Sequence, residues 1–381
     1  MKIMFLIRSL DVGGAERQLV SLARGLQEIG HTVSVAVFYS GGKLEHDLID
    51  SGVVIHSLEK KGRWDIIGFG KRVVQLVKSQ QIDIFHSYLP GANIIAVLAK
   101  PLLGKTPVVL AVAASNMDLS CYDRTARLTY WLESRLAKFS ELIISNSKAG
   151  LLCAVQRGFP ENSMIVLPNP HDTEKFKQNP DDRQRVRQQW GVKDKEILIG
   201  TIARFDTMKD HKNFIKAALI LSKEQQDARF VCVGDGSDAY ISALQELTVQ
   251  LGIDVRFIWP GPRQDMPDVY SALDINTCSS AFGEGLPNAI GEAMSCGTPC
   301  VVTDVGDCAR IVGDTGEVVS PGSPQALAGG WRKMIERLDK EGSAVGEKSR
   351  ERIVNKFSKQ KAVELTDVEF RKLLSNTSAK I

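Results

Sequence analysis

The sequence lacks any run of apolar residues long enough to cross a membrane. The best candidate, 93–103, is interrupted by Lys100 and Pro101, whereas a membrane-spanning helix needs about 20 predominantly apolar residues. The apolar stretch near the N-terminus, 3–7, is shorter than a secretion signal requires and is followed at once by Arg8. We therefore expect no transmembrane helix and interpret this stretch as a first β-strand.

Cysteine pairs and strong charge are also missing. The 381 residues include 7 cysteines, an odd number with no Cys-x-x-Cys pair, which argues against a disulfide framework or a zinc site and fits a reducing cytoplasm. The net charge of +3 is too small for a nucleic-acid-binding protein, although the excess of basic residues lies in the first half. With 43% hydrophobic and 24% charged residues, the composition excludes fibrous and disordered proteins.

Short apolar runs alternate with longer amphipathic segments along most of the chain. The runs are rich in Val and Ile without polar alternation, as in strands buried on both faces of a parallel sheet. The predicted strands are 2–7, 32–38, 53–57, 82–87, 107–113, 142–145 and 164–167, then 197–202, 229–233, 255–259, 275–277 and 299–303. The predicted helices are 16–29, 66–80, 124–139, 213–225, 239–251, 288–296 and 325–338. This alternation predicts an α/β fold with doubly wound parallel sheets.

A change of composition divides the alternation in two. Residues 168–195 are rich in proline and charge, so we interpret them as a linker or surface stretch. We therefore expect two Rossmann-like domains, 1–170 and 171–356, that face each other across a central cleft. The segment 357–381 begins with an amphipathic helix that no strand follows, and we expect it to pack back onto the first domain. Ligands of such sheets bind beyond the carboxyl ends of the strands.

The segment 282–307, FGEGLPNAIGEAMSCGTPCVVTDVGD, carries the strongest functional signal. Its first glycines allow backbone N–H groups to turn toward an anion, and Pro287 suits the first turn of a helix whose N-terminus can bind phosphate. Glu284 lies in the loop and Glu292 follows two turns later on the helix. A carboxylate beside a phosphate site is electrostatically unfavourable unless it accepts hydrogen bonds from donors such as sugar hydroxyl groups. Two carboxylates at this spacing therefore suit a ligand with two hydroxyl-bearing parts joined by phosphates.

This Glu-x7-Glu pattern resembles the signature of the retaining GT-B glycosyltransferases of the family 4 type, which include bacterial lipopolysaccharide, capsule and exopolysaccharide enzymes. The resemblance extends along nearly the whole chain. It implies that Glu284 contacts hydroxyl groups of the donor sugar, that Glu292 holds the ribose diol of the nucleotide, and that backbone amides meet the diphosphate. The nucleotide-sugar contacts implied in this segment are Gly285, Leu286, Pro287, Asn288 and Glu292.

A second constellation, IARFDTMKDHKNF, spans 202–214. Arg204 follows a predicted strand, and Lys209 comes five residues later, before a predicted helix. Two cations at the carboxyl end of a strand can clamp a diphosphate and offset the charge that develops as it leaves. This matches the Arg/Lys pair of the family, so we predict Arg204, Lys209 and Glu284 as catalytic residues. The chain has no Asp-x-Asp pair and no cluster with metal-ligand spacing, so we expect neither a metal nor another cofactor.

Three turns are further candidates for contacts with the nucleotide sugar. Gly13 and Gly14 separate the first strand from the first helix, where glycine lets the backbone approach a ligand; a plain tight turn is the alternative. Gly234 begins a Gly-x-Gly-x-x-Ala segment, but the acidic residue that NAD binding needs lies at the wrong end of the next strand. We therefore assign Gly234 to the nucleotide and the turn with Pro262 and Arg263 to its base.

Two residues of the first half are candidates for the acceptor side. His86 ends a buried strand and would line the cleft, although a structural histidine bonded near a strand end fits equally. Relatives often carry a histidine after the next strand, but this chain has AVAASNMD there. No histidine role is transferred to that position, and Asn116 is the candidate for a hydroxyl or carbonyl contact.

The segment 123–139 combines arginine and lysine with Tyr130 and Trp131. Such a helix either packs on the core through an apolar face or rests on an anionic membrane surface. Asp123 and Glu133 dilute the basic pattern and favour the core helix. The membrane contact stays as the alternative, because family members often use lipid-linked acceptors.

Taken with the resemblance, these features imply a cytoplasmic enzyme that moves a sugar from a UDP- or GDP-sugar to a saccharide, free or lipid-linked, in bacterial surface polysaccharide synthesis. The resemblance also implies retention of configuration, and we expect no nucleic-acid partner. A sugar-nucleotide epimerase or hydrolase on the same fold is one alternative. A nucleotide-binding scaffold without activity is the other.

Overall fold

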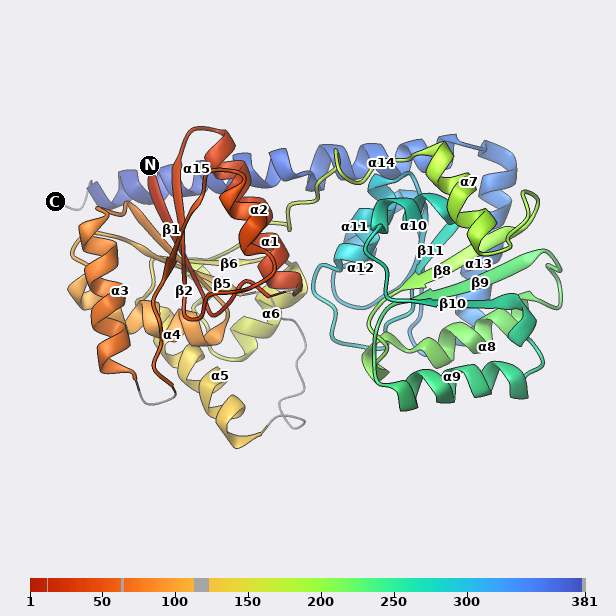
Figure 1. Ribbon diagram of the computed structural model, residues 1–381, viewed down its shortest axis with the longest axis horizontal. Coiled ribbons are helices and arrows are strands. Elements are labelled where there is room, and N and C mark those ends of the chain that lie inside the picture. Colours follow the sequence, from red (N-terminus) through yellow and green to blue (C-terminus); the bar gives the residue numbers. More distant parts are fainter. Residues whose placement is uncertain (12, 63–64, 113–122, 379–381) are drawn as a thin grey trace. The chain divides into compact units, whose positions relative to one another are not determined.

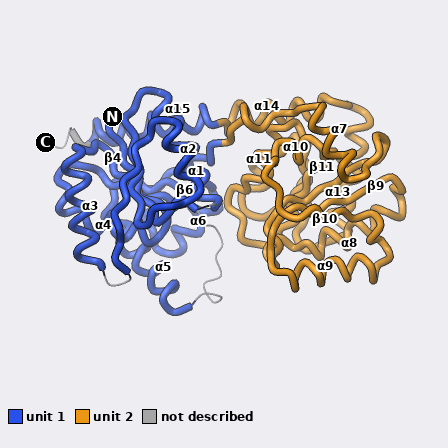
Figure 2. The backbone as a smooth tube through the Cα atoms, viewed as in Figure 1, with its two compact units in different colours: residues 1–170, 359–381 blue, residues 171–358 orange. Residues whose placement is uncertain are grey.

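The computed structural model describes residues 1–11, 13–62, 65–112 and 123–378, which form two compact units. The first unit contains Met1–Pro170 and Lys359–Ile381, and the second contains His171–Ser358 (Figure 2). Each is an α/β unit with its own parallel sheet (Figure 1). Among the described helices, none combines the length and apolar character that a bilayer-spanning helix needs.

The first unit is built on a seven-stranded sheet with the order β3-β2-β1-β4-β5-β6-β7. Its strands are β1 (Lys2–Ile7), β2 (Thr32–Val37), β3 (Val54–Ser57), β4 (Ile84–Tyr88), β5 (Val108–Val112), β6 (Leu142–Ser145) and β7 (Met164–Val166). The helices between them are α1 (Gly14–Glu28), α2 (Glu45–Ile49), α3 (Ile67–Ser79), α4 (Pro90–Ala99), α5 (Arg124–Leu136) and α6 (Lys148–Gln156). All adjacent strands pair in parallel, as the continuous apolar runs predict.

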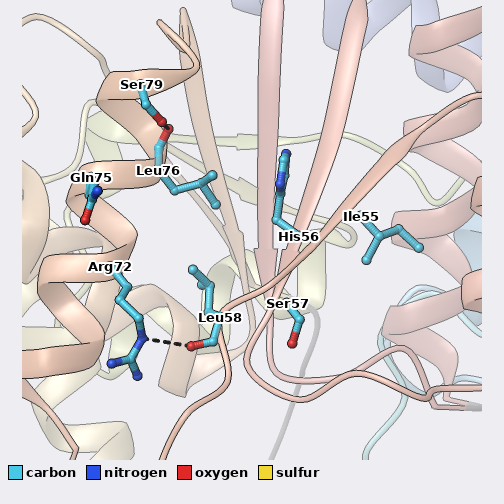
Figure 3. A pocket seen from close by; sticks show the side chains of 8 residues that line it. All are labelled: Ile55, His56, Ser57, Leu58, Arg72, Gln75, Leu76 and Ser79. Atoms are coloured by element: carbon cyan, nitrogen blue, oxygen red, sulfur yellow. Dashed lines mark hydrogen bonds between the residues drawn. The ribbon is translucent and has the colours of Figure 1, made fainter.

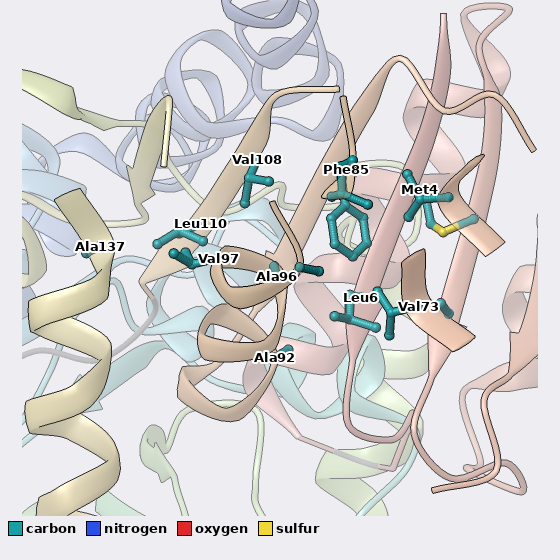
Figure 4. Packing of buried hydrophobic residues seen from close by; sticks show 14 of the residues in the cluster. Met4, Leu6, Val73, Phe85, Ala92, Ala96, Val97, Val108, Leu110 and Ala137 are labelled. Carbon is teal, nitrogen blue, oxygen red and sulfur yellow. The ribbon is translucent and has the colours of Figure 1, made fainter. Parts of the chain in front are cut away.

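Successive side chains of β1 point to opposite faces of this sheet, and both faces are covered. Met4 and Leu6 pack with Phe85 of β4 against α3 and α4 (Figure 4). Ile3, Phe5 and Ile7 pack on the other face with side chains from α1, α2 and the C-terminal helix. Burial on both faces is why these strands show no polar alternation.

The last helix, α15 (Lys359–Ser378), belongs to the first unit. It packs against α1, where Gly25 allows a close approach: a Cβ at this position would lie 2.3 Å from the Val363 side chain. Asp367 pairs with the imidazole of His31 at 2.8 Å, and Phe370 is fully buried in the core. The amphipathic helix expected near the C-terminus therefore completes the core of the first unit.

The second unit has a six-stranded parallel sheet with the order β10-β9-β8-β11-β12-β13. Its strands are β8 (Ile197–Ile202), β9 (Ala228–Val233), β10 (Phe257–Gly261), β11 (Ile275–Cys278), β12 (Cys300–Thr303) and β13 (Glu317–Val319). Its helices are α7 (Pro180–Gln189), α8 (His211–Leu221), α9 (Asp238–Gln250), α10 (Met266–Ala272), α11 (Asn288–Ser295), α12 (Cys308–Val312), α13 (Pro324–Glu341) and α14 (Ala344–Phe357). Trp331 of α13 is fully buried and donates to Thr277 Oγ1 of β11 at 3.0 Å.

The stretch 168–195, interpreted as linker or surface, contains a helix in its central part, α7, of which only Val186 and Arg187 are buried. Asn179 caps this helix and Pro180 opens it. Arg187 is buried although charged, because Asp274 accepts from its guanidinium at 3.0 Å. This partner lies 87 residues away in the chain, so the local composition contained no sign of it.

The order of the second sheet reverses between β8 and β11. Strands β9 and β10 extend it to one side of β8, whereas β12 and β13 extend it to the other side of β11. The loops that follow β8 and β11 therefore leave neighbouring strands and run to helices in opposite directions. In open parallel sheets a ligand crevice forms at such a point.

Candidate functional site

The loop after β8 and the loop after β11 are joined by hydrogen bonds. Ser279 Oγ donates to the Lys209 carbonyl at 2.8 Å, and the Ala281 N–H donates to the Met208 carbonyl at 2.8 Å. The first loop includes a short 3-10 helix, η5 (Thr207–Lys209), just before α8. These bonds hold the two sequence constellations together, 75 residues apart in the chain.

Lys209 and Glu284 form an ion pair across the two loops. Lys209 Nζ lies 2.5 Å from Glu284 Oε1, and the side chains are 19% and 6% exposed. Ser280 Oγ donates to the same carboxylate oxygen. A buried carboxylate needs such partners, because removing a charge from water costs several kcal/mol.

The pKa of Lys209 reflects two opposing effects. Burial is the largest single effect and would lower the pKa of this ammonium group, but the combined effects of Glu284, Cys278 and Asp206 raise the pKa above its usual value. Lys209 is therefore a fixed cation at neutral pH and not a proton donor or acceptor. Its remaining N–H groups can donate to an anion that enters the crevice.

Arg204 lies on the other side of the same loop and is 72% exposed. Its Nε donates to Asp206 Oδ2 at 2.7 Å. The other Asp206 oxygen accepts from the Lys209 backbone N–H at 3.2 Å and so caps η5. One carboxylate therefore orients the Arg204 side chain and fixes the turn that carries Lys209. Sequence reasoning missed Asp206, because its two contacts depend on the folded loop.

The loop between β11 and α11 approaches the loop after β12 closely. Gly306 has φ +60°, and a Cβ there would lie 2.1 Å from the Glu284 carbonyl oxygen. The Asp307 N–H donates to the Gly285 carbonyl at 2.9 Å. Leu286 is buried, and Pro287 is the N-cap of α11, which begins at Asn288. Gly306 is thus required for the shape of the predicted diphosphate loop, and only its place in the motif hinted at this.

Glu292 lies on α11, and Tyr270 of α10 donates to its Oε2 at 2.9 Å. Burial, followed by the Glu292 charge, raises the pKa of Tyr270 well above its ordinary value. The phenol therefore stays protonated and holds this carboxylate in a fixed orientation. A carboxylate held in this way suits bidentate binding of a diol. Tyr270 was not predicted, because a tyrosine 22 residues before Glu292 has no recognisable spacing.

The turns after β9 and β10 flank the same end of the sheet. Gly234 has φ +157°, and a Cβ there would lie 1.9 Å from the Ala203 carbonyl oxygen, so only glycine fits between the two loops. Pro262 and Arg263 follow β10 directly. Arg263 Nε donates to Asp265 Oδ1 at 2.8 Å, which fixes the guanidinium near Trp190. The three predicted contacts therefore lie at the carboxyl ends of β9 and β10, and their role in binding the nucleotide stays a prediction.

Of the predicted residues in the first unit, the two glycines lie at the start of the first helix as expected, whereas His86 does not lie at the end of its strand. Gly13 caps α1, and Gly14 is its first residue, at the carboxyl end of β1. His86 lies in the middle of β4, not at its end, and is fully buried among Phe5, Tyr88 and Phe370. Burial lowers the pKa of His86 to about 3. It is a core histidine, and we do not retain it on the acceptor side.

Asn116, the other acceptor-side prediction, lies outside the described residues. A cavity of about 410 Å³ does occur in the first unit, at the edge strand β3 (Figure 3). It is lined by Ile55, His56, Ser57, Leu58, Arg72, Gln75, Leu76 and Ser79. None of these belongs to the predicted site, and Arg72 is already bonded to the Leu58 carbonyl at 2.9 Å. Within the described residues, no three His, Cys, Asp or Glu side chains are grouped so that they could hold a metal ion.

Two family models match the chain. One, described as Glycosyltransferase Family 4, matches residues 12–175, and the other, described as Glycosyl transferases group 1, matches residues 182–356. The chain is 27% identical over 235 residues to the UDP-Gal:alpha-D-GlcNAc-diphosphoundecaprenol alpha-1,3-galactosyltransferase of Escherichia coli, a match that covers 61% of this chain and 60% of that protein.

A second curated relative comes from Campylobacter jejuni. The chain is 29% identical over 309 residues to its GalNAc-alpha-(1->4)-GalNAc-alpha-(1->3)-diNAcBac-PP-undecaprenol alpha-1,4-N-acetyl-D-galactosaminyltransferase, covering 77% of each. The crystal structure of Anabaena HepE in complex with UDP superposes with a TM-score of 0.86 at 23% identity, over 98% of this chain and 100% of that chain. The fold is therefore GT-B, and the chain belongs to the glycosyltransferases of the family 4 type.

Proposed function

We propose that this glycosyltransferase moves a hexosyl unit from a UDP- or GDP-sugar to a saccharide acceptor that is free or linked to a lipid diphosphate. We propose further that the reaction retains the anomeric configuration, needs no metal ion, and serves bacterial surface polysaccharide synthesis from the cytoplasm. The observation that carries the proposal is the Lys209–Glu284 pair, which the switch point of the second sheet places beside the N-terminus of α11.

The proposed chemistry uses the positive groups at this edge to stabilise the departing nucleoside diphosphate. Lys209 and Arg204 donate to the phosphate oxygens, and the backbone amides at Gly285 and Leu286 add partial positive charge at the start of α11. For Arg204 this requires that the guanidinium exchange part of its bond to Asp206 for phosphate, which its exposure permits.

Glu284 and Glu292 then divide the remaining contacts. Glu284 accepts from hydroxyl groups of the donor sugar while it holds Lys209 against the leaving group. Glu292, oriented by Tyr270, accepts from the ribose diol. The departing phosphate takes the proton from the attacking hydroxyl of the acceptor, so that no protein base is needed.

The relatives support the substrate class. The two curated relatives are named for transfer to saccharides on diphosphoundecaprenol or PP-undecaprenol, with α-linked products. The similar Anabaena protein binds UDP. Support for metal independence comes from the residues: the site offers two cationic side chains and a helix N-terminus where a metal-dependent enzyme needs a carboxylate pair for the cation.

The experiment incubates the purified protein with radiolabelled UDP- and GDP-sugars, with and without a bacterial lipid extract, in the presence or absence of EDTA. Transfer to a lipid-soluble product that depends on the extract and persists with EDTA is the expected result. Epimerised or hydrolysed sugar nucleotide formed without extract would indicate the alternative enzyme class. Loss of transfer with EDTA, restored by Mg²⁺, would contradict the metal-independent mechanism.

A further inference from the structure

Two cysteines of the second unit lie together at the crevice, and the chemistry proposed above uses neither. Cys278 is the last residue of β11, and Cys308 is the first residue of α12. Cys278 is partly buried, Cys308 is 0% exposed, and both pack in the same apolar cluster. Their thiols form a hydrogen bond with each other. The fold thus pairs two cysteines that have no Cys-x-x-Cys spacing in the chain.

Cys278 also touches the ion pair that we predict to be catalytic. Its Sγ lies 3.9 Å from Glu284 Oε1, the carboxylate oxygen that pairs with Lys209. The same sulfur lies 3.6 Å from Ser280 Oγ. The Cys278 carbonyl accepts from Thr303 Oγ1 at 3.3 Å, which fixes the end of β11 against β12. The thiol therefore has a defined place beside the ammonium and carboxylate groups of the site.

The surroundings divide the roles of the two thiols. The hydrogen bond with Cys308 has the largest effect on Cys278, and with the help of Lys209 and Ser280 it lowers the pKa of the Cys278 thiol, although burial and Glu284 oppose it. The same bond, followed by burial, raises the pKa of the Cys308 thiol well above its usual value. Cys278 is thus the sulfur that carries the negative charge, and Cys308 is the sulfur that keeps its proton and donates it.

Three other cysteines of the second unit provide a contrast. Burial raises the pKa of Cys296 and of Cys300 to about 12, and it also raises that of Cys232. Because the thiolate is the nucleophilic form of cysteine, a buried thiol with a high pKa reacts slowly. Cys278 is therefore expected to react with an oxidant before these three.

We propose that Cys278 and Cys308 form a dithiol that hydrogen peroxide oxidises to a disulfide, and that this modification switches the site off. First, the Cys278 thiolate attacks peroxide: an S–O bond forms, the O–O bond breaks, and hydroxide leaves. Second, the Cys308 sulfur attacks the resulting sulfenic acid: an S–S bond forms, the S–O bond breaks, and the Cys308 proton leaves with the hydroxyl group as water. The two thiols supply the two electrons that reduce the peroxide.

The disulfide would distort the crevice, because a covalent bond draws the two sulfur atoms closer together than a hydrogen bond does. The chain just before Cys308 has no free space for this movement. A Cβ on Gly306 would lie 2.1 Å from the Glu284 carbonyl oxygen, and the Asp307 N–H donates to the Gly285 carbonyl at 2.9 Å. A shift of Cys308 therefore displaces the loop that carries Glu284. The effect on activity rests on the proposed function, whereas the oxidation does not.

The test treats the full-length protein with hydrogen peroxide, blocks the remaining thiols with iodoacetamide in denaturant, and maps the products by mass spectrometry. Trypsin is unsuitable, because 264–310 contains no internal lysine or arginine and carries all four cysteines from Cys278 to Cys308. Cleavage after glutamate and before aspartate releases 274–284 and 307–313 as separate peptides. The expected product is a disulfide between these two peptides, with Cys296 and Cys300 alkylated as free thiols.

Variants separate the two steps. Cys308→Ser should stop the reaction at a sulfenic acid on Cys278, which dimedone traps. Cys296→Ser removes a buried cysteine of the same cluster and is the matched control, which should form the disulfide as the wild type does. Melting curves show that each variant folds.

Function is measured on the same samples. The oxidised wild type should lose at least about tenfold in kcat, and its binding of UDP or GDP should weaken, because Lys209 and Glu284 are displaced. Dithiothreitol should restore both. Cys278→Ser should keep the rate that it has before peroxide treatment.

Three results would overturn the proposal. They are the absence of a Cys278–Cys308 disulfide after treatment, oxidation of Cys296 to the same extent as Cys278, and full activity of the protein once the disulfide is complete. A protein that transfers no sugar before treatment would contradict the proposed function and not the oxidation, whose effect is then measured by nucleotide binding alone.

Discussion

Replacing Lys209 by alanine tests both the electrostatics of the site and its chemistry. The change removes the cation that pairs with Glu284, whose side chain is 6% exposed. Two unit charges about 3 Å apart attract by about 5 kcal/mol at an effective dielectric constant of about 20, and much of this is offset by desolvation. Breaking one partner of such a pair leaves the other buried and unpaired, which costs about 3 kcal/mol.

The double variant Lys209→Ala/Glu284→Gln removes the unpaired charge and should regain about 2 kcal/mol of that loss. Urea unfolding, followed by circular dichroism, measures both values for the second unit. Activity should behave differently: both variants should lose about 10²- to 10³-fold in kcat, because a fixed cation no longer stabilises the leaving diphosphate. Lys212→Ala, at an exposed position on α8, is the matched control and should change neither quantity.

Two results would refute this reasoning. If Lys209→Ala keeps full activity, the cation does not act on the leaving group. If the double variant is no more stable than Lys209→Ala, the loss of stability does not come from leaving the Glu284 side chain without its partner.

Three further predictions concern other parts of the molecule. Tyr270→Phe removes the donor to Glu292 and should raise KM for the donor about tenfold with little change in kcat, as measured by initial rates; an unchanged KM would count against a ribose contact. Gly234→Ala places a Cβ against the Ala203 carbonyl and should lower stability by at least about 2 kcal/mol in urea unfolding; wild-type stability would show that the loops can separate. His86→Phe should make the protein less sensitive to acid. Because the folded pKa of His86 is about 3, only the unfolded chain binds the proton between pH 6.5 and 3, and the free energy of unfolding of the wild type therefore decreases as the pH is lowered. The decrease is about 2 kcal/mol between pH 7 and 5. Equal loss of stability in both proteins over that range would contradict the burial of His86.

The sequence predicted most strands because each is a continuous apolar run. Such runs arise because helices cover both faces of each sheet and bury the side chains on both sides. The strands β1, β6 and β8 begin and end where the apolar runs do. The apolar pattern of the sequence did not predict α7 or α14, because these helices are rich in charged residues that are stabilised by partners distant in the chain. Arg187, for example, reads as a surface residue until Asp274 is placed beside it.

The site was predictable to the extent that its residues lie in short local motifs. Arg204, Lys209 and Glu284 follow strands that prove to be neighbours, and the chain order of strands in a doubly wound sheet explains their proximity. Tyr270 and Asp206 could not be found in this way, because each acts through a contact formed only on folding. His86 was misplaced because β4 continues to Tyr88, two residues beyond His86.

The measurement that tests the central claim most directly is a crystal structure of the protein with UDP or GDP bound. The account predicts the diphosphate against Lys209, Arg204 and the start of α11, with the ribose hydroxyls on Glu292. A nucleotide bound away from these residues, with the Lys209–Glu284 pair untouched by phosphate or sugar, would contradict it.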